Sequence, residues 1–498
     1  MSSMLKDPKP LRFDTRLAGY AYQLEAVEAV KNLPYAALFH EMGLGKTKIA
    51  LDLSLEWIRD SSVDSVLIVT KNGLVANWVD EIRRHTYLSA HVLDQNRSSN
   101  FFVLNSAARL YLTHYEAVKS EERRLKLFLK TRRVATILDE SHKIKNPESD
   151  TAKVFHRLSS GFARRVIMTG TPVANRPFDL WSQIYFLDGG RALGTDFKDF
   201  REHLDLRNDL WSDQSKRERF ETELAAAFEK IRPFTVRKTK DQAGIELPEK
   251  EIVNLLVDPE QTQLALYEQY RKALSATVMQ GGQLIVDDAE AILKRLLRLV
   301  QIASNPLLID DGYSAIPGKF PHLLRIIKRA VQEKSKIIVW TNFIENVRWL
   351  RKQLMEFGPV MVHGSMSIDE RNQAITDFKT DPSIHVLIAT PGAAKEGLTL
   401  TVANYAVFYD RSFSLDDYLQ AQDRIHRISQ KQNCYVWNLI CAGTVDEWLD
   451  SLLTAKRLAA QLAQADITSD DYARLANYDF GAIVHEILGL KGHTHGDE

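Results

Sequence analysis

The chain has 498 residues, of which 45% are hydrophobic and 26% charged, a globular composition that excludes collagen-like and disordered proteins. Lys+Arg and Asp+Glu both number 65, so the formal net charge is zero and binding of nucleic acid through bulk charge is not expected, although local basic patches are possible. Two cysteines exclude a disulfide framework, and the sequence shows neither a signal peptide nor a run of about 18 apolar residues. We therefore expect an intracellular protein, cytoplasmic in a prokaryotic or viral host or nuclear in a eukaryote, and neither secreted nor in a membrane.

Short apolar runs alternate with helical patterns in two regions, which is typical of parallel sheets with crossover helices. In the first region the expected strands are Ala36–Phe39, Ser65–Val69, Phe101–Leu104, Ala135–Leu138 and Arg165–Met168. In the second region they are Lys336–Trp340, Val360–His363, His385–Ala389, Tyr405–Tyr409 and Cys434–Leu439. The pattern predicts an α/β protein with two lobes.

The stretch between the two regions, at about 188–308, has few strand signals. Its charged helical segments are Ser215–Lys230, Pro259–Val278 and Ala289–Ala303. Further on, Thr444 and Glu447 in T-V-D-E form a capping-box pattern that predicts a helix to about Ala463. The predicted domains are lobe 1 at 1–240 with a helical protrusion at about 188–232, lobe 2 at 241–455 with a protrusion at about 258–305, and a C-terminal helical segment and tail at 456–498.

A phosphate-binding loop is predicted where the first strand leads into H-E-M-G-L-G-K-T at residues 40–47. In such a loop, backbone N–H groups at a helix start point at the anion, while Lys46 reaches the terminal phosphates and the Thr47 hydroxyl ligates Mg²⁺. The strict pattern G-x-x-x-x-G-K-[ST] has glycine where His40 stands, so this loop is a variant. The expected ATP-binding residues are Met42, Gly43, Leu44, Gly45, Lys46 and Thr47.

An ATPase also needs one carboxylate for the metal and one for the attacking water. The apolar run Val134–Leu138 ends in D-E-S-H at residues 139–142. We expect Asp139 to hold Mg²⁺ and Glu140 to orient or deprotonate the water. Most acidic pairs are solvated surface, but the position after a buried-strand pattern favours the catalytic interpretation. Mg²⁺ with ATP is the only metal we expect.

These motifs, taken together, resemble those of a known family. Residues 40–47, L-D-E-S-H-K-I-K-N at 138–146 and M-T-G-T-P at 168–172 are similar to motifs I, II and III of the superfamily 2 helicases. The resemblance is closest to the Swi/Snf-like branch of DNA translocases, whose motif VI resembles Q-A-Q-D-R-I-H-R-I-S-Q at 420–430. It spans about Tyr22 to Leu453 and implies two RecA-like lobes that close on Mg-ATP.

The resemblance implies roles for individual residues. Gln23 matches the glutamine that reads the adenine edge, with a helix-surface glutamine as the alternative. Arg424 and Arg427, which we expect on one helix face, match arginines that reach the γ-phosphate. The residues that match elements coupling the nucleotide state to the rest of the lobes are His142, Thr169, Gly170, Thr171 and Gln420.

The motif V region is a looser match, and it holds Gly397 as a further candidate for nucleotide binding. The family usually shows Gly-Leu-Asn-Leu where this chain has G-L-T-L at 397–400, and Ser429 replaces a usual glycine. Ser412-Phe413-Ser414 stands where Trp-Asn-Pro is common. These departures concern the coupling between lobes and the subfamily, and they do not touch the hydrolytic residues.

Binding of DNA by a neutral chain requires local contacts to phosphates, which carry no sequence information. The candidates, each of which also has a structural alternative, are Lys71, Asn77, Thr113, Arg237, Lys238, Lys240, Asn342, His363, Gly364 and Thr390. The basic run Lys119–Arg133 is better explained as a solvated helix face. No zinc-finger spacing or RNA-recognition aromatic signature is present, so sequence-specific recognition is not expected.

The leading hypothesis is a monomeric, ATP-driven motor that moves along double-stranded DNA without sequence specificity. Alternatives are a strand-separating DNA helicase and an enzyme that remodels or anneals branched DNA. A non-catalytic DNA-binding scaffold is a remote alternative, because Glu140 and both arginines are intact.

Overall fold

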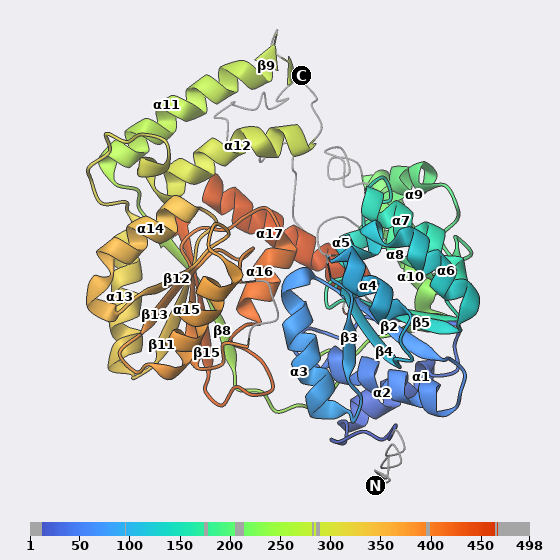
Figure 1. Cartoon of the computed structure of the whole chain (residues 1–498). Helices are drawn as coiled ribbons and strands as arrows, with labels where there is room; N and C mark the ends of the chain where they lie inside the picture. The colour runs from blue at the N-terminus through green and yellow to red at the C-terminus, as the bar shows by residue number, and fades with distance from the viewer. Residues whose placement is uncertain are drawn as a thin grey trace. The chain divides into compact units, whose positions relative to one another are not determined.

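The computed structural model describes residues 12–94, 96–173, 178–204, 214–280, 283–284, 289–394, 399–463 and 466 (Figure 1). The chain divides into two compact units. Unit 1 comprises Met1–Val173, Phe178–Leu204 and Ala226–Ile245, and unit 2 comprises Ala174–Pro177, Asp205–Ala225 and Glu246–Glu498. Each unit contains one parallel sheet with helices around it, so the predicted two-lobe α/β fold is confirmed.

The sheet of unit 1 has seven strands among the described residues, in the order β3-β4-β2-β5-β6-β1-β7. All its neighbouring strands are parallel, so helices must cross over between them. The strands are β1 (Tyr35–Leu38), β2 (Ser65–Thr70), β3 (Ala90–Val92), β4 (Leu110–His114), β5 (Val134–Asp139), β6 (Arg164–Met168) and β7 (Thr235–Val236). The helices of this part of the chain are α1 (Ala21–Val30), α2 (Lys46–Arg59), η1 (Asn72–Leu74), α3 (Val75–His85), α4 (Arg97–Leu104), α5 (Tyr115–Ser120), α6 (Glu122–Thr131), η2 (Ser141–Ile144), α7 (Asp150–Leu158), η3 (Ser159–Gly161), α8 (Asp179–Asp188), α9 (Phe197–Leu204), α10 (Gln214–Ile231) and η4 (Arg232–Phe234).

The sheet of unit 2 has the order β12-β13-β11-β14-β15-β8 among the described residues, again with parallel neighbours. Its strands are β8 (Lys250–Val257), β11 (Lys336–Trp340), β12 (Val360–Val362), β13 (Val386–Ala389), β14 (Ala403–Phe408) and β15 (Cys434–Cys441), and β9 (Met279–Gln280) with β10 (Gln283–Leu284) forms a separate antiparallel pair. The helices are α11 (Gln261–Val278), α12 (Ala289–Ser304), η5 (Pro306–Leu308), α13 (Lys319–Gln332), α14 (Ile344–Gln353), η6 (Met355–Phe357), α15 (Ile368–Thr380), α16 (Leu415–Gln422) and α17 (Val445–Ala463).

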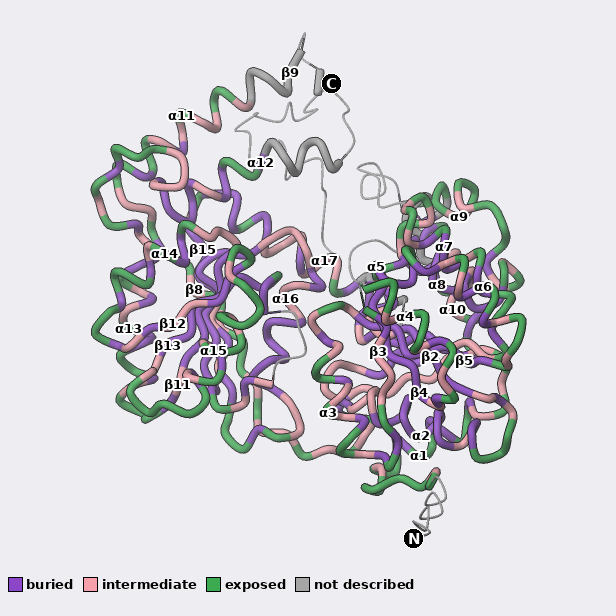
Figure 2. Tube along the Cα trace, in the orientation of Figure 1, coloured by how far each residue is buried: buried purple, intermediate pink, exposed green. Residues whose placement is uncertain are grey.

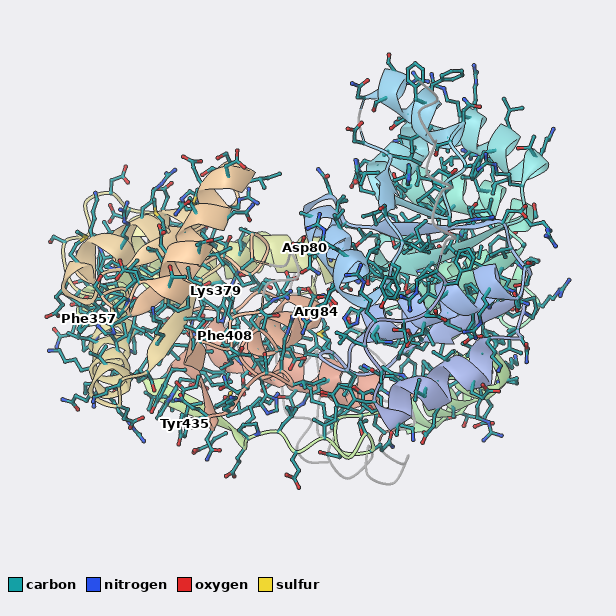
Figure 3. The ribbon with its side chains drawn as sticks, turned by 60° about the horizontal axis from the view of Figure 1, so that its bottom comes forward. Asp80, Arg84, Phe357, Lys379, Phe408 and Tyr435 are labelled. Atoms are coloured by element: carbon teal, nitrogen blue, oxygen red, sulfur yellow. The ribbon has the colours of Figure 1, made fainter. Side chains whose placement is uncertain are left out.

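Burial follows from the layered arrangement within each unit. Strands β2 and β14 are buried at every position, as expected where helices cover both faces of a parallel sheet. Figure 2 labels β2 and draws buried residues in purple. In unit 2, Phe408 contributes to the apolar cluster with Trp340, while the ring of Tyr435 lies 4.9 Å from that of Tyr405 in the cluster on the other face; Figure 3 labels Phe408 and Tyr435. No described helix combines the length and apolar character needed to cross a membrane.

Most predicted strands and all three predicted helical segments are confirmed, but Phe101–Leu104 is not a strand. It belongs to helix α4, whose start is capped by the Asn96 side chain, which accepts hydrogen bonds from Ser98 and Ser99 N–H groups. Phe101 and Phe102 are 53% and 73% exposed on this helix. The two adjacent aromatic residues therefore led to a wrong strand prediction. The strand of this region is β4, which is buried at every position.

Two further differences concern unit 2. The eight-residue strand β8 lies in a stretch that showed few strand signals, and it pairs with β15 along its whole length. The helix predicted from Thr444 is present as α17, but its start is not the reciprocal capping box. The Thr444 hydroxyl accepts from Asp446 N, and the Glu447 carboxylate accepts from Gly443 N instead of from Thr444.

Candidate functional site

The candidate site of unit 1 lies at the carboxyl ends of four neighbouring strands. The sheet order places β2, β5, β6 and β1 side by side. Thr70, Asp139, Thr169 and His40 therefore come from adjacent strand ends at one edge of the sheet. This edge is where open parallel sheets bind ligands.

The loop between β1 and α2 has the backbone of a phosphate cradle. Gly43 has φ 85° and Gly45 has φ 67°, a left-handed conformation that side chains disfavour. Gly45 also directly precedes α2, and a Cβ there would lie 2.5 Å from Gln23 Nε2. The Lys46 ammonium donates to the carbonyl oxygens of His40 (2.8 Å) and Glu41 (3.2 Å), so the loop surrounds a positive charge at the start of a helix.

Gln23 is part of this loop's support. Its side chain is 3% exposed, so the alternative of a helix-surface glutamine is wrong. Its Oε1 accepts from Tyr20 N (3.0 Å), and its Nε2 donates to the carbonyl oxygen of Leu44 (3.1 Å). The Tyr22 hydroxyl donates to the same carbonyl (3.1 Å), so two side chains of α1 fix the glycine turn.

Asp139 ends β5 with its carboxylate held by two donors. Its Oδ2 accepts from the Thr70 hydroxyl (3.0 Å) and from the Trp78 indole N–H (2.8 Å). The Tyr115 hydroxyl donates to the Asp139 backbone carbonyl (2.8 Å). Burial and the neighbouring Glu140 carboxylate raise the pKa of Asp139 above its usual value, despite the opposing effect of its hydrogen bonds and of Lys46.

Glu140 adopts φ 54° and ψ 51°, a left-handed conformation that is costly for a residue with a Cβ. Its Oε2 lies 3.2 Å from His142 Nδ1. Burial disfavours the charged carboxylate, but His142, Lys71 and Lys46 outweigh burial and hold the pKa of Glu140 below its usual value. The strained residue is therefore an ionised carboxylate, which is the form that a general base requires.

The T-G-T segment at 169–171 packs on the phosphate loop. A Cβ at Gly170 would lie 2.4 Å from Met42 Cγ and 3.3 Å from Lys46 Nζ, so glycine is required for this approach. The Thr169 hydroxyl accepts from Thr171 N (3.2 Å) and closes the turn. A shift of the loop would therefore move this segment.

Three candidate DNA contacts lie beside the phosphate loop instead of apart from it. Strand β7 pairs with β1, and the residues that follow it run alongside the loop. Arg237 donates to the Phe39 carbonyl (2.8 Å), the Lys238 ammonium lies 3.1 Å from Glu25, and the Lys240 ammonium lies 3.5 Å from Glu41. This proximity was not predicted, because about 200 residues separate the two segments in the chain.

The other candidate DNA contacts of unit 1 differ in exposure. Asn77 is exposed and Lys71 is half-buried at the start of η1. Thr113 is 1% exposed, and its hydroxyl donates to the Leu93 carbonyl (3.0 Å). The Thr113 side chain therefore has a structural role in this conformation.

In unit 2, Arg424 and Arg427 do not share a helix face. Helix α16 ends at Gln422, and both arginines follow it in turns, so this expectation is wrong. Arg424 is 4% exposed, whereas Arg427 is half-buried and donates to the Thr399 hydroxyl (3.0 Å) and the Asp423 carbonyl (2.9 Å). Gln420 is 3% exposed and donates to Asp416 (3.0 Å).

The remaining candidates of unit 2 lie at the carboxyl edge of its sheet, except Gly397, which is outside the described residues. His363 is 3% exposed, with Nδ1 2.9 Å from the Ser365 hydroxyl. Thr390 is 8% exposed, and Gly364 is exposed with its carbonyl accepting from Arg371 (2.8 Å). Gly364 thus offers an exposed backbone position, and His363 does not offer an exposed side chain.

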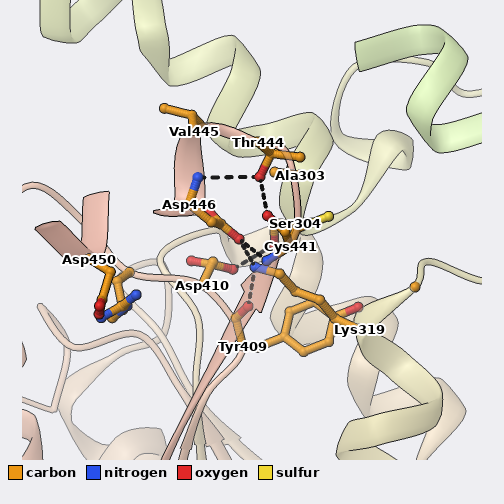
Figure 4. Close-up of polar contacts among 12 residues, drawn as sticks. Ala303, Ser304, Lys319, Tyr409, Asp410, Cys441, Thr444, Val445, Asp446 and Asp450 are labelled. Atoms are coloured by element: carbon orange, nitrogen blue, oxygen red, sulfur yellow. Dashed lines mark hydrogen bonds and ion pairs between the residues drawn. The ribbon is translucent and has the colours of Figure 1, made fainter. Parts of the chain in front are cut away.

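A buried polar network at this edge was not predicted, and Figure 4 labels its residues Ser304, Lys319, Tyr409, Asp410 and Asp446. Asp410, which is 1% exposed after β14, accepts from Ser304 (2.8 Å), from Thr341 (2.5 Å), and from the Asn342 backbone N–H (2.7 Å) and side-chain amide (2.8 Å). The Asn346 amide is a fifth donor (3.3 Å). Nearby, the fully buried Lys319 pairs with Asp446 and donates to the Tyr409 carbonyl (2.9 Å). Asn342, a candidate DNA contact, is therefore held in place by Asp410.

The residues of unit 1 fit Mg-ATP. The glycine turn and helix start suit phosphates, while the Thr47 hydroxyl and the Asp139 carboxylate supply the oxygen ligands that Mg²⁺ prefers, usually with several waters. No group of three or more His, Cys, Asp or Glu side chains suited to a metal occurs among the described residues. Mg²⁺ would supply positive charge at the phosphates, and Glu140 would hold and deprotonate the water.

Comparison with known proteins decides the family. Residues 22–308 match the SNF2-related domain, and residues 318–429 match the helicase conserved C-terminal domain. The chain belongs to the SNF2-related family. The suggested resemblance is thus confirmed, and the chain is classed with the ATP-dependent enzymes of helicase superfamily 2.

Individual SNF2-type relatives are distant. An "Uncharacterized ATP-dependent helicase" of Mycoplasma pneumoniae is 27% identical over 439 residues, which cover 86% of this chain and 40% of the relative. The "DNA repair and recombination protein RAD54-like" of Mus musculus is 26% identical over 461 residues, which cover 82% of this chain and 60% of the relative. The chain therefore spans about two fifths to three fifths of their length. Among solved structures, the Sulfolobus solfataricus SWI2/SNF2 ATPase core in complex with dsDNA is 25% identical, with TM-score 0.42 and coverage of 93% of this chain and 97% of that one.

Proposed function

We propose that the chain is a DNA-dependent ATPase that moves along duplex DNA without sequence specificity. The observation that carries this proposal is the carboxyl edge of unit 1. There Lys46 lies in the glycine turn after β1, while Asp139 ends the central strand β5 and Glu140 follows it, with β6 between the two strands. The same edge continues into the Lys71 segment, whose charge acts on Glu140. A nucleotide site and a candidate DNA contact are therefore built on shared elements.

The proposed roles follow from the chemistry of each side chain. The glycine turn and Lys46 bind the phosphates, Thr47 and Asp139 hold Mg²⁺, and Glu140 accepts the proton of the attacking water. Gln23 identifies the adenine. Duplex DNA is favoured as the partner because the family's motif set is present and no base-reading module is evident in the sequence.

Arg424 and Arg427 are assigned to the transferred phosphoryl group, where negative charge develops. An arginine in this role contributes about 10³–10⁵ in rate. Arg427→Ala should lower kcat by about 10³-fold with much less change in nucleotide affinity, because the interaction strengthens in the transition state. Nucleotide binding by equilibrium titration and steady-state ATPase rates measure the two effects. A near-parental kcat in this variant would remove Arg427 from the mechanism.

The decisive experiment measures ATP hydrolysis without DNA, with single-stranded DNA, with duplex DNA and with RNA. Duplex DNA should stimulate at least as well as single strands, and affinity should fall with salt at a slope of about −0.9 per phosphate contact. Triplex displacement without strand displacement is expected of a translocase, and strand displacement would instead identify a helicase. Strong stimulation by RNA with none by duplex DNA would refute the assignment to DNA.

A further inference from the structure

We propose that Trp78 is a positioning residue that transmits contact with a nucleic-acid backbone to the metal-binding carboxylate of Asp139. This inference rests on the proposed function. Its starting point is that both donors to Asp139 Oδ2, the Thr70 hydroxyl (3.0 Å) and the Trp78 indole N–H (2.8 Å), flank one segment of the chain. That segment, residues 71–77, contains the candidate DNA contacts Lys71 and Asn77.

The Trp78 hydrogen bond is specific. An indole N–H can only donate, and Trp78 is 1% exposed, so its hydrogen bond to Asp139 satisfies a donor that has little access to water. Three other buried tryptophans use no carboxylate: Trp57 donates to the Lys31 carbonyl (2.8 Å), and the buried indole nitrogens of Trp181 and Trp340 have no hydrogen-bond partner in the described structure. Trp78 thus places its one polar atom on the residue expected to hold the metal.

Both donors act on the same oxygen, and this fixes the orientation of the carboxylate. Among the described residues, Asp139 Oδ1 accepts no side-chain hydrogen bond. The carboxylate is therefore held through one oxygen, which leaves Oδ1 available to a metal ion. Partners that orient a metal ligand in this way commonly change metal affinity when they are removed.

The segment between the two donors has little slack. Thr70 ends β2, η1 begins two residues later, and α3 follows η1 directly. Leu74, which is 5% exposed, anchors its middle in the core. A displacement at Lys71 or Asn77 would therefore reach Thr70 and Trp78 instead of being absorbed by a loop.

Helix α3 has two faces that suit a relay. Trp78 and Ile82 are buried, four residues apart on one side. Asn77, Asp80 and Arg84 are exposed on the other side, and Figure 3 labels Asp80 and Arg84. A phosphate backbone contacting Asn77 on the exposed face would push or turn the same helix turn that carries the indole.

Trp78→Phe tests the relay, because it keeps an aromatic ring and removes the N–H group. Trp57→Phe is the matched control: Trp57 is also 1% exposed, lies in the same apolar cluster and loses an equally short hydrogen bond, but to a carbonyl remote from Asp139. Thr70→Val removes the second donor, and Thr70→Ser retains it. All variants are made in the full chain.

The first measurement is binding of a fluorescent ADP as a function of Mg²⁺, with Mn²⁺ binding followed by electron paramagnetic resonance. Trp78→Phe and Thr70→Val should raise the half-saturating metal concentration about 10-fold, with ADP affinity in EDTA unchanged. Trp57→Phe and Thr70→Ser should stay near the parent. Equal metal affinity in Trp78→Phe and Trp57→Phe would overturn the role of Trp78.

The second measurement repeats the metal titration and the ATPase assay with duplex DNA. In the parent, DNA should change the half-saturating metal concentration, and in Trp78→Phe this change and the stimulation of hydrolysis should shrink several-fold at saturating DNA. An unaltered DNA effect in Trp78→Phe would overturn the relay. If DNA fails to stimulate the parent, the proposed function and the relay both fail, while the metal titration still decides whether Trp78 positions Asp139.

Discussion

Two aspartates occupy equivalent places in the two units but have different environments. Asp139 ends β5 and Asp410 follows β14, each at the carboxyl edge of a central strand. Asp139 is half-buried, receives two side-chain donors on one oxygen and stands next to the like charge of Glu140. Asp410 is 1% exposed and receives five donors over both oxygens.

This difference is what we expect if Asp139 binds a ligand and Asp410 stabilises the fold. A buried charge is tolerated when hydrogen bonds saturate it, and Asp410 meets that condition with protein groups alone. Asp139 does not, and Glu140 beside it has a strained backbone. The number of hydrogen bonds that each carboxylate accepts, more than its burial, therefore distinguishes the ligand-binding role of Asp139 from the structural role of Asp410.

The largest expected effect tests the functional side of the comparison. Glu140→Gln should lower the ATPase kcat roughly 10³-fold, because the amide cannot take the proton of the attacking water. Nucleotide binding should persist, and Lys46→Ala should differ by losing turnover together with the contact to the terminal phosphates. Steady-state rates and ADP titration provide the measurement. Normal turnover in Glu140→Gln would refute the assignment of the acidic pair.

Matched Asp→Asn substitutions test the comparison directly. Asp410→Asn should lower the free energy of unfolding by about 3 kcal/mol, because an amide NH₂ would face donors that now bind a charge. Asp139→Asn should leave stability unchanged or raise it, since it relieves repulsion with Glu140, and should abolish most ATPase activity. Urea unfolding with hydrogen exchange of peptides from β14 and β5 reports on each unit. Equal destabilisation by both substitutions would remove the distinction.

The stability of unit 1 should depend on pH through His40, which lies beside the phosphate loop. Burial, with the nearby Lys46 charge, lowers the pKa of His40 to about 4. The unfolded chain, with an ordinary histidine pKa near about 6.5, binds the proton first, so stability is lost as pH falls from about 6.5 to about 4, by at most about 3 kcal/mol. His40→Asn should flatten this loss in thermal unfolding measured from pH 7 to 4. If His40→Asn loses as much thermal stability between pH 7 and 4 as the parent, protonation of His40 does not destabilise the folded protein.

The smallest effect concerns one of the five donors to Asp410. Asn342→Ala removes one side-chain hydrogen bond to the Asp410 carboxylate and should lower the free energy of unfolding by only about 1 kcal/mol, because four donors remain. Its backbone N–H still donates to Asp410. Denaturant unfolding gives the energy, and duplex-DNA affinity shows whether the amide also contacts phosphate. If Asn342→Ala lowers the free energy of unfolding as much as Asp410→Asn does, the network depends on the Asn342 side chain alone.

The parts of the fold that were predictable are those where local pattern and burial agree. Strand β11 was predicted with its observed bounds, because an apolar run buried on both faces gives a continuous signal. Strand β8 was missed because it is an edge strand with exposed Ile252, Asn254 and Leu256 alternating with less exposed residues amid charged sequence. Phe101 was assigned to a strand because it is apolar, although its side chain is exposed on helix α4.

The candidate hydrolytic residues were found from short motifs, but the residues that support them were not. Lys46 and Asp139 lie in contiguous signatures. The supporting hydrogen bonds join residues that are far apart in sequence. Examples are the bonds from Trp78 to Asp139, from Arg237 to the Phe39 carbonyl and from Ser304 to Asp410.

The pairing of β8 with β15 has a consequence for biosynthesis. The sheet of unit 1 is complete once Val236 has emerged from the ribosome, whereas β8 (Lys250–Val257) must wait for β15 (Cys434–Cys441) before its neighbour exists. At typical translation speeds this delay is on the order of 10–40 s. During that interval an apolar strand with free backbone groups is exposed on a chain whose first half has already folded. We expect chaperones that bind extended apolar segments to engage the nascent chain during this interval.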